Sequence, residues 1–103
     1  MAQPGFGGRA FHPGEALRED YLPDYGWTPE ELAERLRVPV EVVREVLAER
    51  APVTPELALR LGRLFDQGGS FWMNLQLRYD AKHSPAARDI LRIEPVEEIR
   101  KAG

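Results

Sequence analysis

The chain has 103 residues, of which 43% are hydrophobic and 30% are charged, and its formal net charge is −3. This is the composition of one small globular domain and not of a disordered chain. The absence of cysteine excludes a disulfide scaffold, a thiol nucleophile and a cysteine zinc site. The longest apolar runs, such as residues 71–73, are far shorter than the roughly 20 residues of a membrane span. We therefore expect a cytoplasmic protein without membrane contact.

The acidic balance argues against nucleic-acid binding by bulk charge attraction. Any contact with DNA must use a local arrangement of arginines, which far outnumber the two lysines, Lys82 and Lys101. The guanidinium group suits bidentate phosphate contacts, although the same bias is typical of a GC-rich genome. The two histidines, His12 and His83, lie far apart and show no metal-ligand spacing. We expect no catalytic residue, metal or cofactor, and we expect His12 to pack or to cap a helix.

The first third of the chain contains two helix signals. Residues 1–11 are rich in glycine and proline, which predicts a flexible arm. Helical spacing of apolar residues then predicts a helix over about 13–22, stopped near Pro23 and Gly26. Thr28-Pro29-Glu30-Glu31 predicts the start of the next helix, because it combines a capping box with proline at the first helical position.

Three further helices are predicted from similar signals. Residues 37–38 form a very short break, and Pro39 opens a helix that ends near Arg50. Thr54 starts the next helix, which is predicted to end at Gly68-Gly69. Ser70 is placed to cap a fifth helix that is apolar on more than one face. We expect its Trp72 to lie in the core and its second apolar side to meet another subunit.

The second and third predicted helices form a tight pair. Small Ala33 is placed where the two helices come closest, and Val38 fills the corner between them. These features are typical of a helix-turn-helix, which places its second helix in the DNA major groove. Many helical proteins contain such corners, so a purely structural role stays open. The prediction is an all-α fold of five helices, with an arm over 1–11, a helix-turn-helix domain over 12–81 and an extension over 82–103. Within the extension, residues 90–96 are predicted to be a short strand (90–94) or an extended arm, followed by a loose tail.

Two motifs at the ends of this domain resemble those of a known family. His12-Pro13-Gly14-Glu15, followed by Leu17-Arg18-Glu19, is similar to the opening of HigA-type antitoxins. These are Xre-class helix-turn-helix proteins of bacterial toxin–antitoxin modules. The run from Phe71 to Gln76, with Tyr79-Asp80, is similar to the end motif of the same family. The resemblance covers roughly residues 12–80.

The resemblance implies a lambda-repressor-like domain that forms a homodimer. It implies binding of a RelE-like (HigB-type) toxin that cleaves mRNA, and repression of the protein's own operon by binding to operator DNA. Its mechanism is then stoichiometric binding, so we expect no enzyme and no small-molecule substrate. The residues that we predict to bind DNA are Thr28, Arg37, Val40, Glu41, Val42, Arg44 and Arg50. Among them, Arg37, Arg44 and Arg50 would have to supply the phosphate contacts.

Several of these positions depart from the family pattern. Pro29 replaces a glutamine that contacts the DNA backbone, Arg37 replaces the turn glycine, and residues 40–42 replace polar residues of the recognition helix. Residues 28–50 carry four arginines and six glutamates, a balance of −2. Glu41 repels phosphates but is able to accept a hydrogen bond from cytosine, and valines contact thymine methyl groups. We expect operator binding that is weak and salt-sensitive, or lost.

The fifth helix and the C-terminal extension are the predicted dimer interface. Met73 and Leu77 point away from the predicted core stripe, and Ile90 and Ile93 lie in the extension. Gln76 either bonds across an interface or lies on an exposed face. Arg60 and Arg63 lie on the outer side of the fourth helix, as a solvated face or as a contact for an acidic partner or phosphate. Two other functions stay open: a helix-turn-helix regulator without a toxin, and an antitoxin that has lost autonomous DNA binding.

Overall fold

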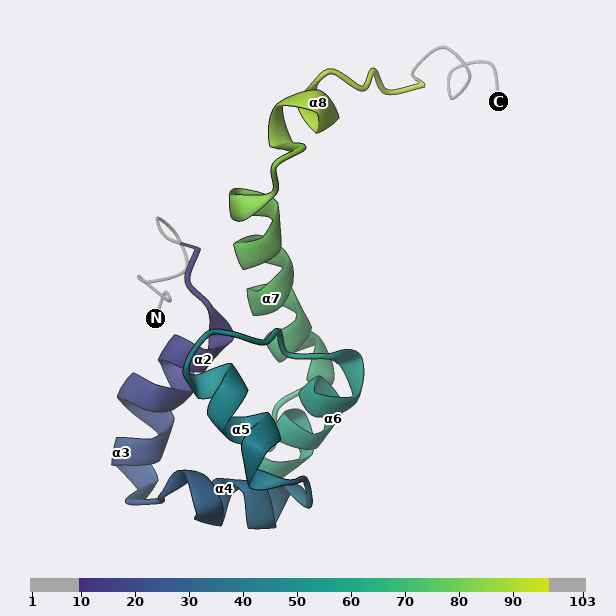
Figure 1. Cartoon of the computed structure of the whole chain (residues 1–103). Helices are drawn as coiled ribbons and strands as arrows, with labels where there is room; N and C mark the ends of the chain where they lie inside the picture. Colours follow the sequence, from purple (N-terminus) through teal and green to yellow (C-terminus); the bar gives the residue numbers. More distant parts are fainter. Residues whose placement is uncertain (1–9, 97–103) are drawn as a thin grey trace.

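The computed structural model describes residues 10–96, so most of the predicted arm over 1–11 and the end of the predicted tail lie outside the described residues. Within this range every regular element is helical, which confirms the predicted all-α fold (Figure 1). The five predicted helices are present and are followed by one short helix. In chain order the elements are α2 (Pro13–Ala16), η1 (Leu17–Tyr21), α3 (Leu22–Tyr25), α4 (Pro29–Leu36), α5 (Val40–Leu47), α6 (Pro55–Leu64), α7 (Gly69–His83) and α8 (Ala87–Leu91).

The first three elements form one helix that continues past Pro23. The proline ring and its missing N–H normally disrupt an α-helix. Here η1 is a π-helical segment, in which the N–H of Leu22 donates to the carbonyl of Leu17, five residues earlier. This wider turn precedes Pro23 and lets the chain stay helical as far as Tyr25. The prediction of an end near Pro23 was wrong, whereas Gly26, at φ 67°, ends the helix as expected.

The predicted capping box at the start of α4 is confirmed. The hydroxyl of Thr28 accepts from the N–H of Glu31 at 3.1 Å, and the carboxylate of Glu31 accepts from the N–H of Thr28 at 2.8 Å. A three-residue turn, 37–39, then leads into α5, which ends at Leu47 rather than near Arg50. The turn is one residue longer than the break predicted over 37–38, because Pro39 is the N-cap of α5 and not its first helical residue.

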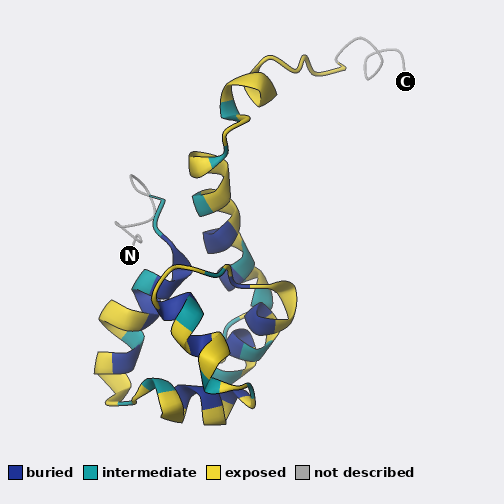
Figure 2. Cartoon of the chain, viewed as in Figure 1, coloured by how far each residue is buried: buried dark blue, intermediate teal, exposed yellow. Residues whose placement is uncertain are grey.

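The core lies between the first helix, α4, α5, α6 and the first half of α7, where the buried residues gather in Figure 2. Trp72 is fully buried, as predicted, and its ring N–H donates to the amide oxygen of Gln67 at 3.0 Å. Ala33 is also buried, and Val38 packs against the core from the turn. These contacts fix α6 and α7 behind the helix-turn-helix.

The start of α2 is locked against α5. The Nδ1 atom of buried His12 accepts from the N–H of Gly14 at 2.9 Å, which confirms the expected capping role. A Cβ atom on Gly14 would lie 1.8 Å from the carbonyl oxygen of Val46 in α5. Only glycine therefore allows α2 to approach α5 this closely. On the same side, Arg18 donates to the carbonyl of Leu47 at 2.6 Å, at the end of α5.

The C-terminal half of α7 and α8 project from the body, giving the molecule a long dimension of 54 Å (Figure 1). The predicted strand over 90–94 was wrong. Ile90 lies in α8, where its N–H donates to the carbonyl of Ala86 at 2.9 Å, and residues 93–96 have no regular structure. A lone strand has no partner for its backbone groups, whereas a helical turn satisfies them locally. The prediction that Ser70 caps the fifth helix was also wrong, because α7 begins at Gly69 with Gly68 at the cap position. The helix before it, α6, ends at Leu64, earlier than the predicted end at Gly68-Gly69.

Candidate functional site

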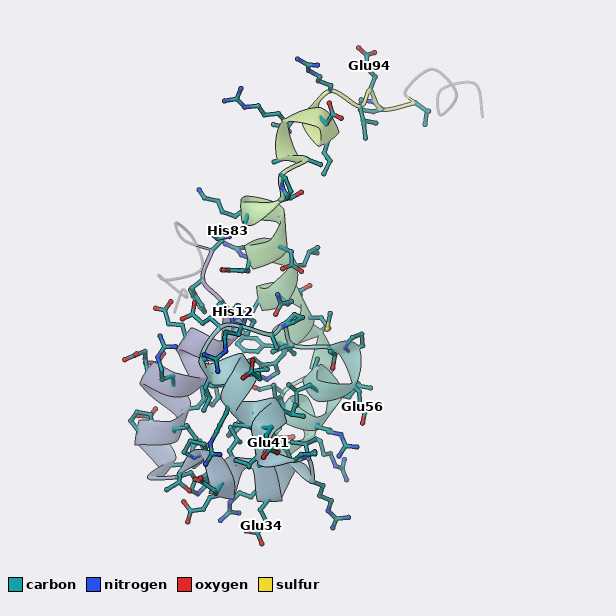
Figure 3. All side chains as sticks on the ribbon, viewed as in Figure 1. His12, Glu34, Glu41, Glu56, His83 and Glu94 are labelled. Atoms are coloured by element: carbon teal, nitrogen blue, oxygen red, sulfur yellow. The ribbon has the colours of Figure 1, made fainter. Side chains whose placement is uncertain are left out.

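The outer face of α5 carries most of the residues predicted to read DNA. Val43, Val46 and Leu47 turn inward to the core, which leaves the opposite side of the helix exposed. Glu41 points outward on this face, and Val42 is 39% exposed (Figure 3). Val40 is half-buried against the core. The N-terminal end of the second helix is the part of a helix-turn-helix that meets base edges.

The two arginines predicted on this helix and just after it are held by carboxylates. Arg44 forms an ion pair with Glu30 at the start of α4. Arg50 forms two hydrogen bonds to Glu45, at 3.1 and 2.8 Å. These bonds lower the pKa of the Glu45 carboxyl below its ordinary value and raise the pKa of Arg50. Such exposed pairs are weak, and they occupy only part of the five N–H donors of each guanidinium, but the nearby carboxylate lowers the attraction of each arginine for a phosphate.

Thr28 and Arg37 occupy different environments from the α5 residues. The hydroxyl and the N–H of Thr28 are both used in the capping box, and Pro29 has no N–H to offer. Arg37 caps the C-terminus of α4 at φ 62°, with an exposed side chain. The predicted DNA-binding residues therefore do not form one continuous surface. Some lie on the exposed face of α5, two are arginines in ion pairs, and the other two lie at a helix cap and in the turn.

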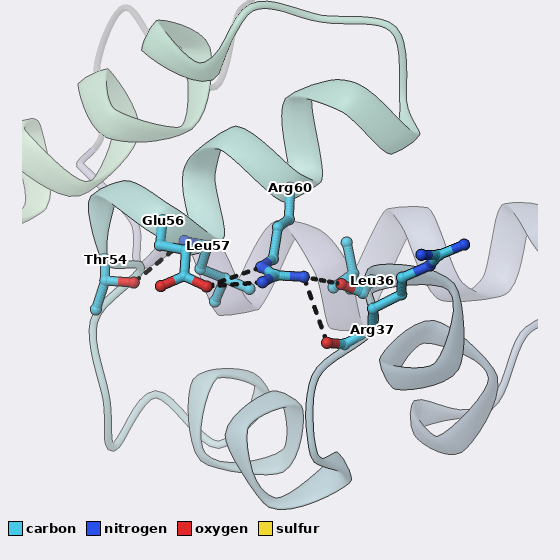
Figure 4. A network of polar contacts seen from close by, with 6 residues as sticks. All are labelled: Leu36, Arg37, Thr54, Glu56, Leu57 and Arg60. Carbon is cyan, nitrogen blue, oxygen red and sulfur yellow. Dashed lines mark hydrogen bonds and ion pairs between the residues drawn. The ribbon is translucent and has the colours of Figure 1, made fainter.

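Arg60 of α6 contacts the turn of the helix-turn-helix. The sequence left its role open between a solvated face and a contact for an acidic partner or phosphate. Its guanidinium donates to the carbonyl of Leu36 at 2.8 Å and to that of Arg37 at 3.3 Å (Figure 4). The same group forms an ion pair with Glu56 at 2.8 Å, one helical turn earlier. The Glu56 and Arg60 spacing is a visible sequence signal, but the contact with the turn is not, because it joins separate elements.

Two surface hollows meet at Arg60. A hollow of about 330 Å³ lies beside α5 and is largely apolar. A second hollow, of about 480 Å³, lies between the end of α4 and α6. The first is lined by Val38, Pro39, Val42, Thr54, Glu56, Leu57 and Arg60. The second, which we call the arginine hollow, is lined by Arg35, Leu36, Arg37, Arg60, Arg63 and Leu64.

Three of the four residues predicted for a dimer interface are exposed. Leu77, Ile90 and Ile93 are 64%, 54% and 71% exposed, whereas Met73 is partly buried against the chain's own core. Gln76 lies inside the monomer, against both expectations for it. Its amide oxygen accepts from the N–H of Val53 at 2.8 Å and its amide nitrogen donates to Asp80 at 2.9 Å.

Between residues 10 and 96, no three His, Asp or Glu side chains come together as metal ligands. None of the helices in the described part of the chain has the length and apolarity that crossing a bilayer requires.

No family model matches the chain. A similar curated relative is virulence-associated protein I of Dichelobacter nodosus, 37% identical over 84 residues, which are 82% of this chain and 78% of the relative. The crystal structure of PA4674 from Pseudomonas aeruginosa with its operator DNA is 37% identical, with a TM-score of 0.75, covering 85% of this chain and 100% of that one. The P. aeruginosa antitoxin HigA, solved with the higBA promoter, is 36% identical with a TM-score of 0.74, covering 85% and 99%. The chain belongs to the HigA family of helix-turn-helix antitoxins.

The two HigA-like end motifs have structural roles in this chain. His12 and Gly14 hold α2 against α5, and Trp72 and Gln76 anchor α7.

Proposed function

We propose that this HigA-family protein is an antitoxin that represses its own operon through its helix-turn-helix. The observation that carries this is the exposed α5 face on a domain that matches, over 85% of the chain, a HigA antitoxin solved with promoter DNA. The protein acts by stoichiometric binding and performs no catalysis. Its place of action is the cytoplasm, where operator DNA lies.

In this proposal α5 enters the major groove of the operator. Val40 and Val42 contact thymine methyl groups, and Glu41 accepts a hydrogen bond from cytosine N4. Arg44 and Arg50 exchange their carboxylate partners for phosphates, which makes the binding sensitive to salt. A homodimer through Leu77, Ile90 and Ile93 then presents two copies of α5 to half-sites about 34–36 Å apart.

A footprint of the protein on its own promoter tests this role. We expect protection of two half-sites separated by about one helical turn of DNA. A folded protein that protects no segment of the promoter would contradict the repressor role.

The second part of the proposal is neutralisation of a small RelE-like toxin. The support is the family itself, since relatives carry antitoxin names. We expect a small basic protein encoded beside this gene to arrest growth when it is expressed alone and not when it is co-expressed with this chain. Growth arrest that persists on co-expression, with the two proteins failing to co-purify, would favour a regulator without a toxin.

The ion pairs of Arg44 and Arg50 favour a second candidate function. In this alternative the chain no longer reads DNA by itself and binds the operator only in complex with its toxin. The footprint separates the two, because the alternative predicts protection only when the toxin is added.

A further inference from the structure

We propose that the arginine hollow, on the flank of the helix-turn-helix, holds a phosphate of the operator backbone. This inference rests on the proposed repressor function and adds a contact that the recognition helix does not supply. The hollow shares Arg60 with the apolar hollow beside α5, and the rest of its lining comes from the end of α4, the first residue of the turn and α6.

The charge of the hollow is unusual for this acidic protein. Four of its six lining residues are arginines: Arg35 lies in the last turn of α4, Arg37 is the C-cap of that helix, and the other two belong to α6. Only Arg60 has a carboxylate partner, Glu56; within residues 10–96 no ion pair involves Arg35, Arg37 or Arg63. Three of the four arginines that line the hollow are therefore not neutralised by an ion pair within the described residues, although most of its exposed lining surface is apolar, as in the hollow beside α5.

The positions of these arginines are set by the fold. Arg35 lies over the ring of Trp27, with its guanidinium carbon 4.3 Å from the ring centroid. Arg60 is held by the turn carbonyls and by Glu56. Arg60 and Arg63 lie on one side of α6, because residues three apart share a helix face. A guanidinium group presents its N–H donors as a planar fork that binds two phosphate oxygens at once, so a hollow lined by several arginines suits a phosphate.

Arg37 supplies a second line of support. Its φ of 62° is a conformation that favours glycine, so a side chain there carries a conformational cost. Arg37 also lies at the start of the turn that leads into α5, three residues before the first residue of the helix whose N-terminal end meets the bases. A phosphate contact from this turn would position α5 in the groove without reading sequence. The occupant is DNA rather than a basic toxin, because a basic surface is repelled by this hollow.

The test compares Arg37→Gln and Arg63→Gln with the wild-type protein by fluorescence anisotropy on operator and scrambled DNA over a range of salt concentrations. Each variant removes one phosphate contact per protomer, so in the homodimer it should lower the slope of log affinity against log salt by about 1.8 and weaken binding roughly sixtyfold at about 100 mM salt, equally on both DNAs. Arg88→Gln, on exposed α8, is the matched control and should leave the slope and affinity unchanged. Thermal unfolding verifies that each variant is folded. Because the side chains of Arg37 and Arg63 are both exposed, we expect neither substitution to lower the stability of the fold.

The outcomes separate the inference from the proposed function. If the wild-type protein binds its operator selectively and both variants keep its affinity and salt slope, the inference is wrong and the repressor role stands. If only operator binding weakens while scrambled DNA is unaffected, these arginines read sequence and the phosphate assignment is also wrong. If the folded wild-type protein shows no selective binding, the proposed function fails and the inference fails with it.

Discussion

Gly14 fixes the distance between the first helix and the recognition helix. Its missing side chain leaves room for the carbonyl oxygen of Val46, which belongs to α5. Because backbone atoms of one helix cannot move without moving the helix, any side chain at this position must separate α2 from α5.

Gly14→Ala should therefore destabilise the fold by about 1–3 kcal/mol or more, the usual range for forcing extra atoms into a packed core. Gly68→Ala is a matched control, since its Cβ would meet no atom closer than 3.5 Å and its φ is −71°. Chemical denaturation of both variants measures the difference. Equal stabilities would show that α2 shifts away from α5 at little cost.

His12 couples the stability of the fold to pH. Burial lowers the pKa of its imidazole below the ordinary value of 6.5, because the charged form is poorly solvated there. Its Nδ1 atom also accepts the N–H of Gly14, which a protonated ring cannot do. Below pH 6.5 the unfolded chain binds a proton that the folded chain resists.

We expect the free energy of unfolding to decrease as the pH falls from about 7.5 through 6.5 towards 5.5. His12→Asn keeps a good helix cap without a titrating group, so its stability should change less over this range. Denaturant titrations at three pH values measure how the free energy of unfolding changes with pH in the wild-type protein and in the variant. The same slope in the two proteins would contradict the role of His12.

The residue roles that could be predicted from the sequence are those whose partners lie close by along the chain. The cap at His12 and the capping box at Thr28 involve partners two or three residues away. The constraint on Gly14 and the burial of Gln76 involve residues of other elements, Val46 and Val53, which no local pattern reveals.

At the scale of elements, the turn of the helix-turn-helix is held from α6. The C-terminal carbonyls of α4 lack partners within their own helix, and Arg60 supplies hydrogen bonds to two of the carbonyls at this end. The turn is therefore fixed to α6 as well as to the core.

Arg60→Met keeps most of the aliphatic stem and removes these hydrogen bonds. We expect it to lower the free energy of unfolding by about 1–2 kcal/mol, as for other hydrogen bonds from a charged donor. Arg63→Met, three residues later on α6 and exposed, should change stability by less than about 0.5 kcal/mol. If both variants unfold at the same denaturant concentration, Arg60 does not stabilise the turn.

The elements themselves were largely predictable, because caps, proline positions and apolar spacing agree from Thr28 to Leu64. Two departures have physical causes. The π-helical η1 lets the first helix pass Pro23, and residues 90–94 have no neighbouring strand to pair with within the described chain. In the candidate site, the residues on α5 followed from the motif, whereas the ion pairs of Arg44 and Arg50 and the arginine hollow depend on tertiary packing.

At the scale of the whole molecule, the projecting C-terminal part carries exposed apolar side chains. Leu77 on α7 and Ile90 and Ile93 after it are all more than half exposed. Apolar groups concentrated on a projecting part are typical of an interface, and a domain this small gains stability from association.

We expect a homodimer of twice the 11.7 kDa chain mass in solution. Leu77→Glu should shift it to the monomer, because it places a charge in the interface. Leu59→Glu, at a similarly exposed leucine on α6, should leave the dimer intact. Light scattering across a concentration range measures both masses. A wild-type monomer at all concentrations, or a Leu77→Glu dimer as stable as the wild type, would contradict this interface.

The central claim is that an acidic chain of this family reads its operator through α5. It is tested most directly by the anisotropy of a labelled fragment of the protein's own promoter, against scrambled DNA, at about 50 and 200 mM salt. We predict selective binding at the lower salt that weakens roughly ten- to a hundredfold at the higher, as for two to four phosphate contacts. The absence of selective binding at 50 mM by the folded protein would contradict the claim.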